Sequence, residues 1–200
     1  MTAGLPPPLE ITIQQMTDEQ IIGRVRGGET RMFGELVQRY QDPVLGMALR
    51  FVGGRGDAED VAQEVFLRAY RGLDGFKGDA KFSTWLYRIT FNLCADWLRR
   101  NRRADRRAAA IEEAAEVADG RVSLEEGMLE TEKRDQVRRA LESLDERYRS
   151  VVVLLYYQKK SYEQIAAVLA LPVKTVETRL YRARKMLREL LESGEEGGVA

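Results

Sequence analysis

Two stretches of the sequence combine clusters of basic residues with aromatic side chains or with side chains that carry a hydroxyl group. Residues 75–103 contain Phe82, Trp85 and Trp97 and end in an arginine cluster. Aromatic rings stack on unpaired bases while arginines hold backbone phosphates, although each of these three rings also suits a protein core. Residues 173–188 carry six basic side chains and one acidic one, which suits the phosphates of duplex DNA. Both stretches predict nucleic-acid binding.

The composition excludes several common kinds of active site. The chain has no histidine, which removes histidine general bases, histidine-assisted nucleophiles and the commonest metal ligand. The single cysteine, Cys94, forms no intramolecular disulfide and is expected to be a small buried hydrophobic residue in a reducing compartment. Carboxylates are plentiful but show no spaced cluster, so we expect no catalytic residues, no metal and no cofactor.

Length and charge indicate a globular protein with an uneven surface. The chain has 200 residues, of which 44% are hydrophobic, enough for one or two compact domains. Basic and acidic residues balance at 32 each, but residues 81–107 carry eight basic and two acidic groups, and residues 108–150 carry seven and twelve. The longest apolar run, residues 151–157, cannot span a bilayer, and the amino terminus lacks the features of a signal peptide. We therefore expect a cytoplasmic protein without membrane insertion.

Nearly every segment has the apolar spacing of an amphipathic helix, which predicts an all-α fold. The first helix begins at Thr17, where Gln20 completes a capping box. A second is expected over residues 30–51, with Pro43 kinking or dividing it. A third begins at Asp57, and a fourth runs from Ser83 into the arginine cluster at residues 99–103. These helices predict one domain over residues 17–103, preceded by a disordered leader, residues 1–16.

The rest of the chain predicts a linker and a second small helical domain. Residues 104–130 carry eight acids against three bases and few large apolar residues, so we expect a flexible acidic linker that is partly helical at most. Helical periodicity returns over residues 131–191. Within it, residues 161–187 are typical of a helix-turn-helix: a short helix over residues 162–169, a turn ending at Pro172, and a helix from Val173. Residues 192–200 are expected to be a disordered tail.

The second helix of this motif has a face that suits a DNA major groove, where side chains reach base edges. Its inward side is apolar, with Val176, Leu180, Ala183 and Leu187. The outward face and its flanks carry Lys174, Thr175, Glu177, Thr178, Arg179, Tyr181, Arg182, Arg184, Lys185 and Arg188. The alternative is an ordinary helical hairpin with a basic solvent face.

Four motifs, in chain order, resemble a bacterial RNA polymerase sigma factor of the sigma-70 superfamily, extracytoplasmic-function (group IV) type. They are DAEDVAQEVFLRAYRGL (57–73), FSTWLYRI (82–89), NLCADWLRR (92–100) and the helix-turn-helix. The resemblance matches residues 17–103 to region 2 and residues 131–191 to region 4. It implies a protein that binds core RNA polymerase, directs it to specific promoters and nucleates promoter melting.

The resemblance assigns two roles to the first domain. The helix from Asp57 is implied to dock on the clamp helices of the largest polymerase subunit, through Asp60, Gln63, Glu64, Phe66, Leu67 and Arg68. The loop over residues 76–81, with residues 82–87 behind it, is implied to capture an extruded base of the non-template single strand at the minus-ten element. The residues implied there are Phe76, Lys77, Gly78, Asp79, Lys81, Phe82, Ser83, Thr84, Trp85, Tyr87, Arg88, Arg99, Arg100, Arg102 and Arg103.

For the second domain, the resemblance implies contact with duplex DNA at the minus thirty-five element, through the outward and flanking residues named above from Lys174 to Lys185. Two residues depart from the family pattern. Ala170 stands where a turn glycine is usual, so the turn either avoids a positive φ or accepts strain. Glu177 stands where a basic residue is common, and its carboxylate can accept from a cytosine amino group.

The resemblance also implies further protein partners. These are the flap of the second-largest polymerase subunit and an anti-sigma factor that holds the protein inactive. The acidic linker is implied to thread near the active-site channel, where its carboxylates imitate nucleic acid. Two other functions stay open at this point: a stand-alone helix-turn-helix regulator, which binds duplex DNA tightly without polymerase, and a Mg²⁺-dependent nuclease built on carboxylates.

Overall fold

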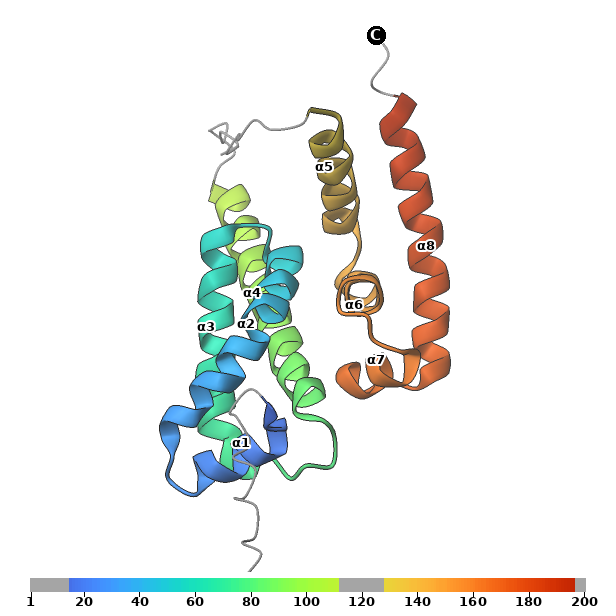
Figure 1. The fold of residues 1–200 in the computed structure, drawn as a ribbon. Helices are drawn as coiled ribbons and strands as arrows, with labels where there is room; N and C mark the ends of the chain where they lie inside the picture. Colours follow the sequence, from blue (N-terminus) through green and yellow to red (C-terminus); the bar gives the residue numbers. More distant parts are fainter. Residues whose placement is uncertain (1–14, 112–127, 197–200) are drawn as a thin grey trace, which may run out of the picture.

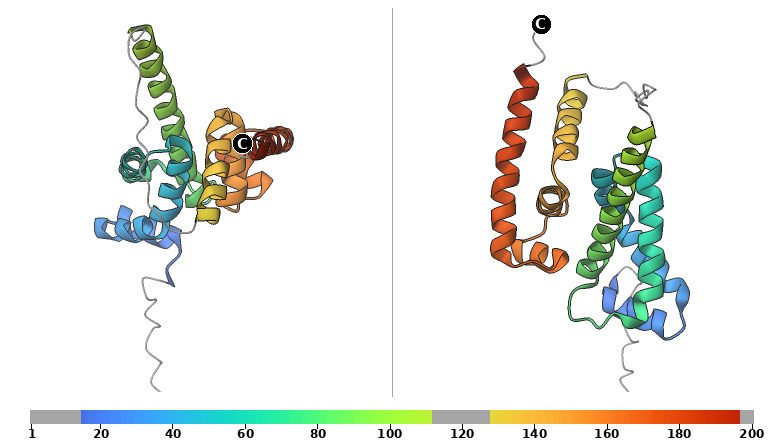
Figure 2. Two further views of the ribbon diagram at one scale, coloured as in Figure 1. Left: turned by 90° about the horizontal axis from the view of Figure 1, so that it is seen from above. Right: turned by 180° about the vertical axis from the view of Figure 1, so that it is seen from behind.

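The computed structural model describes residues 15–111 and 128–196, and the side chains of residues 15–101 and 135–192. The described residues form two helical bundles that lie side by side (Figures 1 and 2). Helices α1–α4 make the first bundle and α5–α8 the second. This arrangement confirms the predicted all-α fold with two small helical units.

The first bundle consists of α1 (Asp18–Arg26), α2 (Phe33–Val52), α3 (Arg55–Gly72) and α4 (Phe82–Ile111). The predicted capping box opens α1: the Thr17 hydroxyl accepts from the Gln20 amide, and the Gln20 side chain accepts from the Thr17 amide at 2.8 Å. Short 3₁₀ turns cover Thr30–Met32 and Leu73–Gly75. Leu36, Phe82 and Leu86 are fully buried where α2, α3 and α4 meet.

Two predicted helix boundaries in this bundle were wrong. Of the two effects predicted for Pro43, division of the helix is contradicted: α2 runs on through Pro43, and the buried side chains of Val44 and Met47 offset the lost hydrogen bond. Helix α3 begins two residues before Asp57, with Gly54 as the extended N-cap. Helix α4 continues to Ile111, because the alanine-rich segment after the arginine cluster contains good helix formers and neither Gly nor Pro.

The second bundle consists of α5 (Met128–Ser143), α6 (Glu146–Val152), α7 (Tyr162–Leu169) and α8 (Val173–Glu196). A π-helical turn, Val153–Tyr157, follows α6 and was not predicted. The helix-turn-helix is confirmed, with α7 at the predicted bounds. Ala170 has φ 52° and ψ 49°, so the turn accepts a left-handed residue, at a cost of about 1–2 kcal/mol relative to a right-handed one.

The two bundles share a buried contact. Arg149 of α6 is only 3% exposed, and its Nη1 donates to the Phe51 carbonyl of α2 at 3.0 Å. Gln158 donates to the Pro43 carbonyl at 3.0 Å. Val151, Leu154 and Ile165 belong to the same buried cluster as the core of the first bundle. The second domain therefore packs on the first, a contact that the predicted flexible linker did not anticipate.

Most of the predicted leader and linker lie outside the described residues, but residues 192–196 of the predicted disordered tail are helical, so that prediction was wrong over those residues. Met16, at the end of the predicted leader, is buried in the core, and α8 continues five residues beyond Leu191. Among residues 15–111 and 128–196, no helix is long and apolar enough to cross a membrane. The side chains described, those of residues 15–101 and 135–192, include no group of three acidic or cysteine residues able to hold a metal ion.

Cys94 lies inside the first bundle, fully buried on α4. Burial, followed by the negative charge of Glu146, raises the pKa of its thiol to about 12. The thiol is therefore protonated and uncharged at neutral pH, which fits the predicted role of Cys94 as a small buried hydrophobic residue.

Candidate nucleic-acid and polymerase interfaces

A small pocket of about 230 Å³ lies between the 76–81 loop and the first turns of α4. The loop leaves the Leu73–Gly75 turn and reverses at Gly78, whose φ of +80° favours glycine. Seven residues predicted for minus-ten binding line the pocket together: Phe76, Lys77, Gly78, Asp79, Thr84, Trp85 and Arg88. Gly75 and Ala80 complete the lining; they were not predicted because their small side chains carry no chemistry that a pattern could reveal.

Trp85 forms a supported aromatic wall of this pocket. Its ring centroid lies 5.2 Å from that of Phe76 and 5.7 Å from that of Phe82. A Cβ on Gly72 would lie 3.4 Å from the Trp85 ring, so the glycine lets α3 approach it closely. Phe82 is fully buried and therefore supports Trp85 from within the core. The half-buried Trp85 ring is held in place at the pocket wall.

Basic side chains lie at the pocket and farther along α4: Lys77 and Arg88 line the pocket, whereas Arg99 and Arg100 lie about three helical turns beyond Arg88. Five of those predicted for minus-ten binding are exposed: Lys77, Lys81, Arg88, Arg99 and Arg100. Arg99 pairs with Asp96 on the preceding turn of α4. The side chains of Arg102 and Arg103 lie outside the described set. Exposed cations at the pocket and along α4 suit contact with a nucleic-acid backbone.

Two predicted minus-ten residues are engaged by the second bundle. Arg88 donates to the Ala167 carbonyl of α7. Tyr87 is buried, and the Lys160 ammonium lies 4.9 Å from its ring centroid. Burial raises the pKa of Tyr87; burial, and then the charge of Lys81, lowers the pKa of Lys160. In this arrangement the second bundle thus covers one side of the pocket region. Ser83 is half-buried on the same turn of α4.

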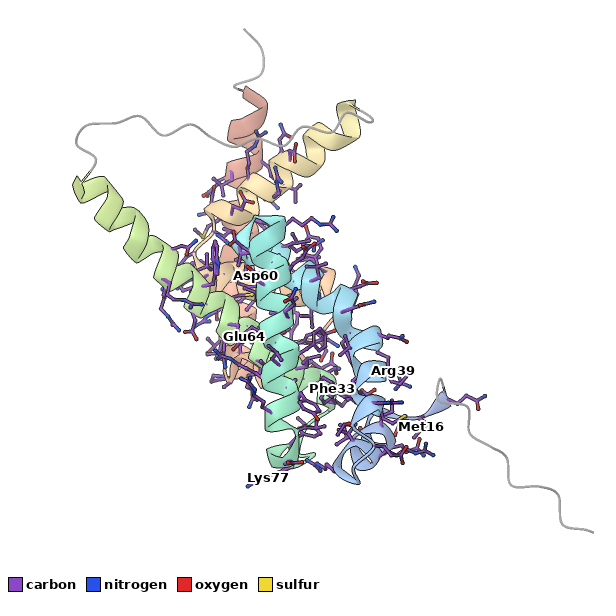
Figure 3. The ribbon with its side chains drawn as sticks, turned by 90° about the vertical axis from the view of Figure 1, so that its left-hand side faces the viewer. Met16, Phe33, Arg39, Asp60, Glu64 and Lys77 are labelled. Carbon is purple, nitrogen blue, oxygen red and sulfur yellow. The ribbon has the colours of Figure 1, made fainter. Side chains whose placement is uncertain are left out.

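The solvent-facing side of α3 carries five of the six residues predicted to bind core polymerase, among them Asp60 and Glu64, which Figure 3 labels. Asp60, Gln63 and Arg68 are exposed, and Leu67 is 48% exposed. Glu64 accepts from the Arg68 Nε at 2.7 Å. The remaining predicted residue, Phe66, is half-buried and packs against the core. Charged groups around one exposed leucine make a surface suited to docking on another helix.

Helix α8 presents six predicted minus thirty-five residues on one exposed side: Lys174, Glu177, Thr178, Tyr181, Arg182 and Lys185. Tyr181 is 72% exposed, and Thr178 fixes its hydroxyl by donating to the Lys174 carbonyl at 2.9 Å. Thr175 and Arg179 are half-buried on the flank. Arg184, also exposed, turns to the other flank, where its Nε donates to the Tyr156 hydroxyl at 2.9 Å.

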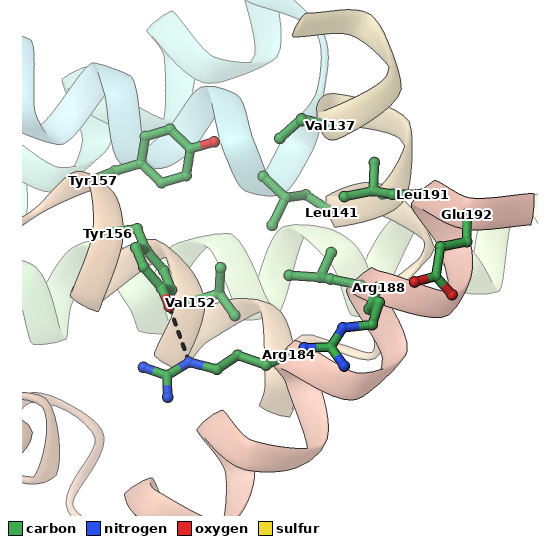
Figure 4. Close-up of a pocket in the computed structure, with 11 residues that line it drawn as sticks. Val137, Leu141, Val152, Tyr156, Tyr157, Arg184, Arg188, Leu191 and Glu192 are labelled. Carbon is green, nitrogen blue, oxygen red and sulfur yellow. Dashed lines mark hydrogen bonds between the residues drawn. The ribbon is translucent and has the colours of Figure 1, made fainter. Parts of the chain in front are cut away.

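An apolar groove of about 550 Å³ lies between α5, the π-helical turn and α8, and the sequence analysis missed it (Figure 4). We call it the α5–α8 groove. It is lined by Val137, Ala140, Leu141, Val152, Tyr156, Tyr157, Arg184, Leu187, Arg188, Leu191 and Glu192. The sequence does carry a signal for it: the apolar spacing of α8 continues from Leu187, at the end of the helix-turn-helix, to Leu191 beyond it.

Comparison with protein families covers both bundles. The family model for sigma-70 region 2 matches residues 36–104, and the model for sigma-70 region 4 matches residues 134–187. RNA polymerase sigma-H factor of Pseudomonas aeruginosa is 38% identical over 186 residues, covering 90% of this chain and 96% of the relative. ECF RNA polymerase sigma-E factor of Escherichia coli K12 is 40% identical over 180 residues, covering 87% and 94%.

Solved structures show the same arrangement of helices. CnrH, solved in complex with the cytosolic domain of CnrY, superposes with a TM-score of 0.67 at 33% identity, covering 88% of this chain and 97% of that one. RpoE of Bartonella quintana, solved with the anti-sigma factor NepR, shares the fold with a TM-score of 0.63 at 23% identity, covering 80% and 96%. Both family models and nearly full-length relatives agree, so this chain belongs to the extracytoplasmic-function sigma factors of the sigma-70 family, non-catalytic proteins that direct RNA polymerase.

Proposed function

We propose that this sigma factor nucleates promoter melting by holding an extruded base of the non-template strand in the pocket beneath the 76–81 loop. The observation that carries the proposal is the supported Trp85 ring at the wall of a small pocket rimmed by Lys77 and Arg88. Opening a base pair costs a few kcal/mol, and stacking on an aromatic ring is worth about 1–3 kcal/mol per base. Melting then needs no catalytic group, only preferential binding of the single strand.

A transcription assay tests this function directly. Core polymerase, with and without the protein, is supplied with a supercoiled library of candidate promoters, and unpaired thymines are mapped with permanganate. We expect initiation and an open bubble that both depend on the protein. Tight duplex binding without core and no bubble on any template would instead favour a role confined to duplex recognition. Family membership leaves no support for the nuclease alternative.

The exposed side of α3 is proposed to dock on the clamp helices of the largest polymerase subunit. Reversing two charges there, Asp60→Arg with Glu64→Arg, is expected to weaken holoenzyme assembly about tenfold or more. The new arginines would repel basic groups of the polymerase, and ion pairs made by the two carboxylates would be lost. Titration of labelled core polymerase measures the change. Glu29→Arg is the control for charge reversal, since Glu29 is an exposed acid outside α3 that faces Arg24 at 3.8 Å. An equal loss in the control would argue against this face.

The exposed side of α8 is proposed to read the minus thirty-five element in the major groove. Arg182→Ala is expected to cost about 1–3 kcal/mol of duplex binding and to relax preference at one base position. Binding of holoenzyme to a set of single-base promoter variants measures both effects. Arg147→Ala serves as control, because Arg147 is an exposed arginine of α6 paired with Asp145. Uniform weakening at every position would assign Arg182 to a phosphate instead.

The α5–α8 groove is proposed to receive an amphipathic helix of the polymerase flap. Its length along two helices and its apolar lining fit the helix-in-groove mode of recognition. A protein regulator of the anti-sigma type is proposed to compete for these surfaces, consistent with the solved complex of CnrH with the cytosolic domain of CnrY. The proposed place of action is the cytoplasm, where polymerase and promoter DNA are found.

A further inference from the structure

We propose that Arg26 of α1 is a positioning residue for base capture: it fixes the start of the 76–81 loop and thereby the shape of the pocket. The inference rests on the proposed function of that pocket. Arg26 lies about fifty residues upstream of the loop, at the carboxyl end of α1, and nothing in its local sequence pattern marks it. Its role becomes visible only where α1 meets the Leu73–Gly75 turn.

The guanidinium of Arg26 donates hydrogen bonds to three backbone carbonyls at the start of the loop. Its Nε donates to the Leu73 carbonyl at 3.2 Å, and its Nη2 donates to the carbonyls of Leu73, Asp74 and Phe76. These carbonyls lie in and just after the Leu73–Gly75 turn, where the Leu73 carbonyl also accepts from the Phe76 amide at 3.1 Å, and Arg26 is the side-chain donor that joins all three. A planar fork with several donors suits such a set better than an ammonium does.

The held backbone is also part of the pocket. Phe76 lines it, and its ring packs against Trp85 and against Phe82, whose centroid lies 5.9 Å away. Fixing the Phe76 carbonyl therefore fixes the aromatic wall and the starting direction of the chain toward Gly78. The loop has no regular secondary structure of its own, so its shape depends on such external contacts.

Loss of the guanidinium should loosen the loop without unfolding the bundle. Arg26 is exposed, and water can replace it at the freed carbonyls. The loop would then adopt conformations that do not fit a base. The entropic cost of ordering the loop would be incurred when the strand binds, which weakens binding. A contact from Arg26 to a phosphate predicts a different signature, because removing it would also reduce the salt dependence of binding.

The test compares Arg26→Ala, Arg26→Lys and Arg24→Ala in the full-length chain assembled with core polymerase. Arg24 is the matched control: it lies on the same helix, is exposed, and faces Glu29 at 3.8 Å. The probe is a fluorescent single strand carrying the minus-ten region of a promoter identified in the transcription assay, titrated at several salt concentrations. Hydrogen exchange at residues 76–81 and thermal melting are measured on the same free proteins.

We expect Arg26→Ala to weaken single-strand binding about tenfold with an unchanged salt slope, and to speed exchange in the loop, with a melting temperature close to wild type. Arg26→Lys should lie closer to the alanine variant than to wild type, and Arg24→Ala within about twofold of wild type. Binding and exchange equal to those of Arg24→Ala would overturn the proposal, as would a salt slope reduced by about 0.7, the value for one lost phosphate contact.

The exchange measurement separates this inference from the function on which it rests. If wild-type holoenzyme opens no bubble on any template, the proposed function fails. Faster loop exchange in Arg26→Ala would then still show that Arg26 positions the loop. If the wild-type holoenzyme opens promoters but loop exchange and single-strand binding are the same in Arg26→Ala as in wild type, only the positioning role fails.

Discussion

Replacing Trp85 by leucine is expected to lower open-complex formation about ten- to hundredfold. Leucine keeps apolar bulk against Phe76 and Phe82 but offers no ring on which a base can stack, and such stacking is worth about 1–3 kcal/mol. The loss should appear in permanganate reactivity and in multi-round transcription. Holoenzyme assembly should stay at the wild-type level, because the proposed polymerase-binding side of α3 faces elsewhere.

Trp97→Leu is the matched control for this prediction. Trp97 is also a half-buried tryptophan of α4 that packs on the same core, but it does not line the pocket. Comparable melting temperatures for the two variants would show that any difference in opening is not a difference in stability. If both variants open the promoter equally well, Trp85 has no specific role in base capture.

Placing glutamates at both edges of the α5–α8 groove, Val137→Glu with Leu191→Glu, is expected to reduce minus thirty-five-dependent initiation about tenfold or more. Both side chains line the groove yet are partly exposed, so the bundle should still fold. A helix docking there would bury two carboxylates without partners, which costs several kcal/mol. Transcription from promoters with and without a minus thirty-five element measures the effect.

Leu190→Glu controls for the added charge on α8. Leu190 neighbours Leu191 and is 39% exposed, but it lies outside this groove. We expect the control to initiate normally and the double variant to keep its affinity for core polymerase through α3. Wild-type activity of the double variant on every promoter would mean that the groove is not used in initiation.

Local signals in the sequence were sufficient for most helices. The capping box at Thr17 and the apolar spacing of α7 gave boundaries that the structure confirms, because such signals act within a few residues. A predicted boundary failed where no such signal exists, as at the alanine-rich end of α4, and packing keeps α2 continuous through Pro43. The contact of Arg149 with the Phe51 carbonyl spans 98 residues and leaves no periodic trace.

The candidate sites divide in the same way. Chemistry that depends on residue type, such as Trp85 beside cations or the exposed side of α8, could be predicted from the sequence. Features made by distant segments could not: Arg26 reaches the loop only through the fold, Tyr87 is covered by Lys160, and Arg184 turns to Tyr156. The α5–α8 groove likewise exists only once α5 and α8 lie together.

The buried contact between the bundles competes with any partner that binds only when the two bundles are separated. Such a partner binds with its intrinsic dissociation constant divided by the fraction of molecules in which α7 has left α4. If about 1% are separated, the apparent affinity falls about a hundredfold. Weakening the hydrogen bond between Arg149 and Phe51 would then tighten the binding of such a partner with no change to the surface that the partner touches.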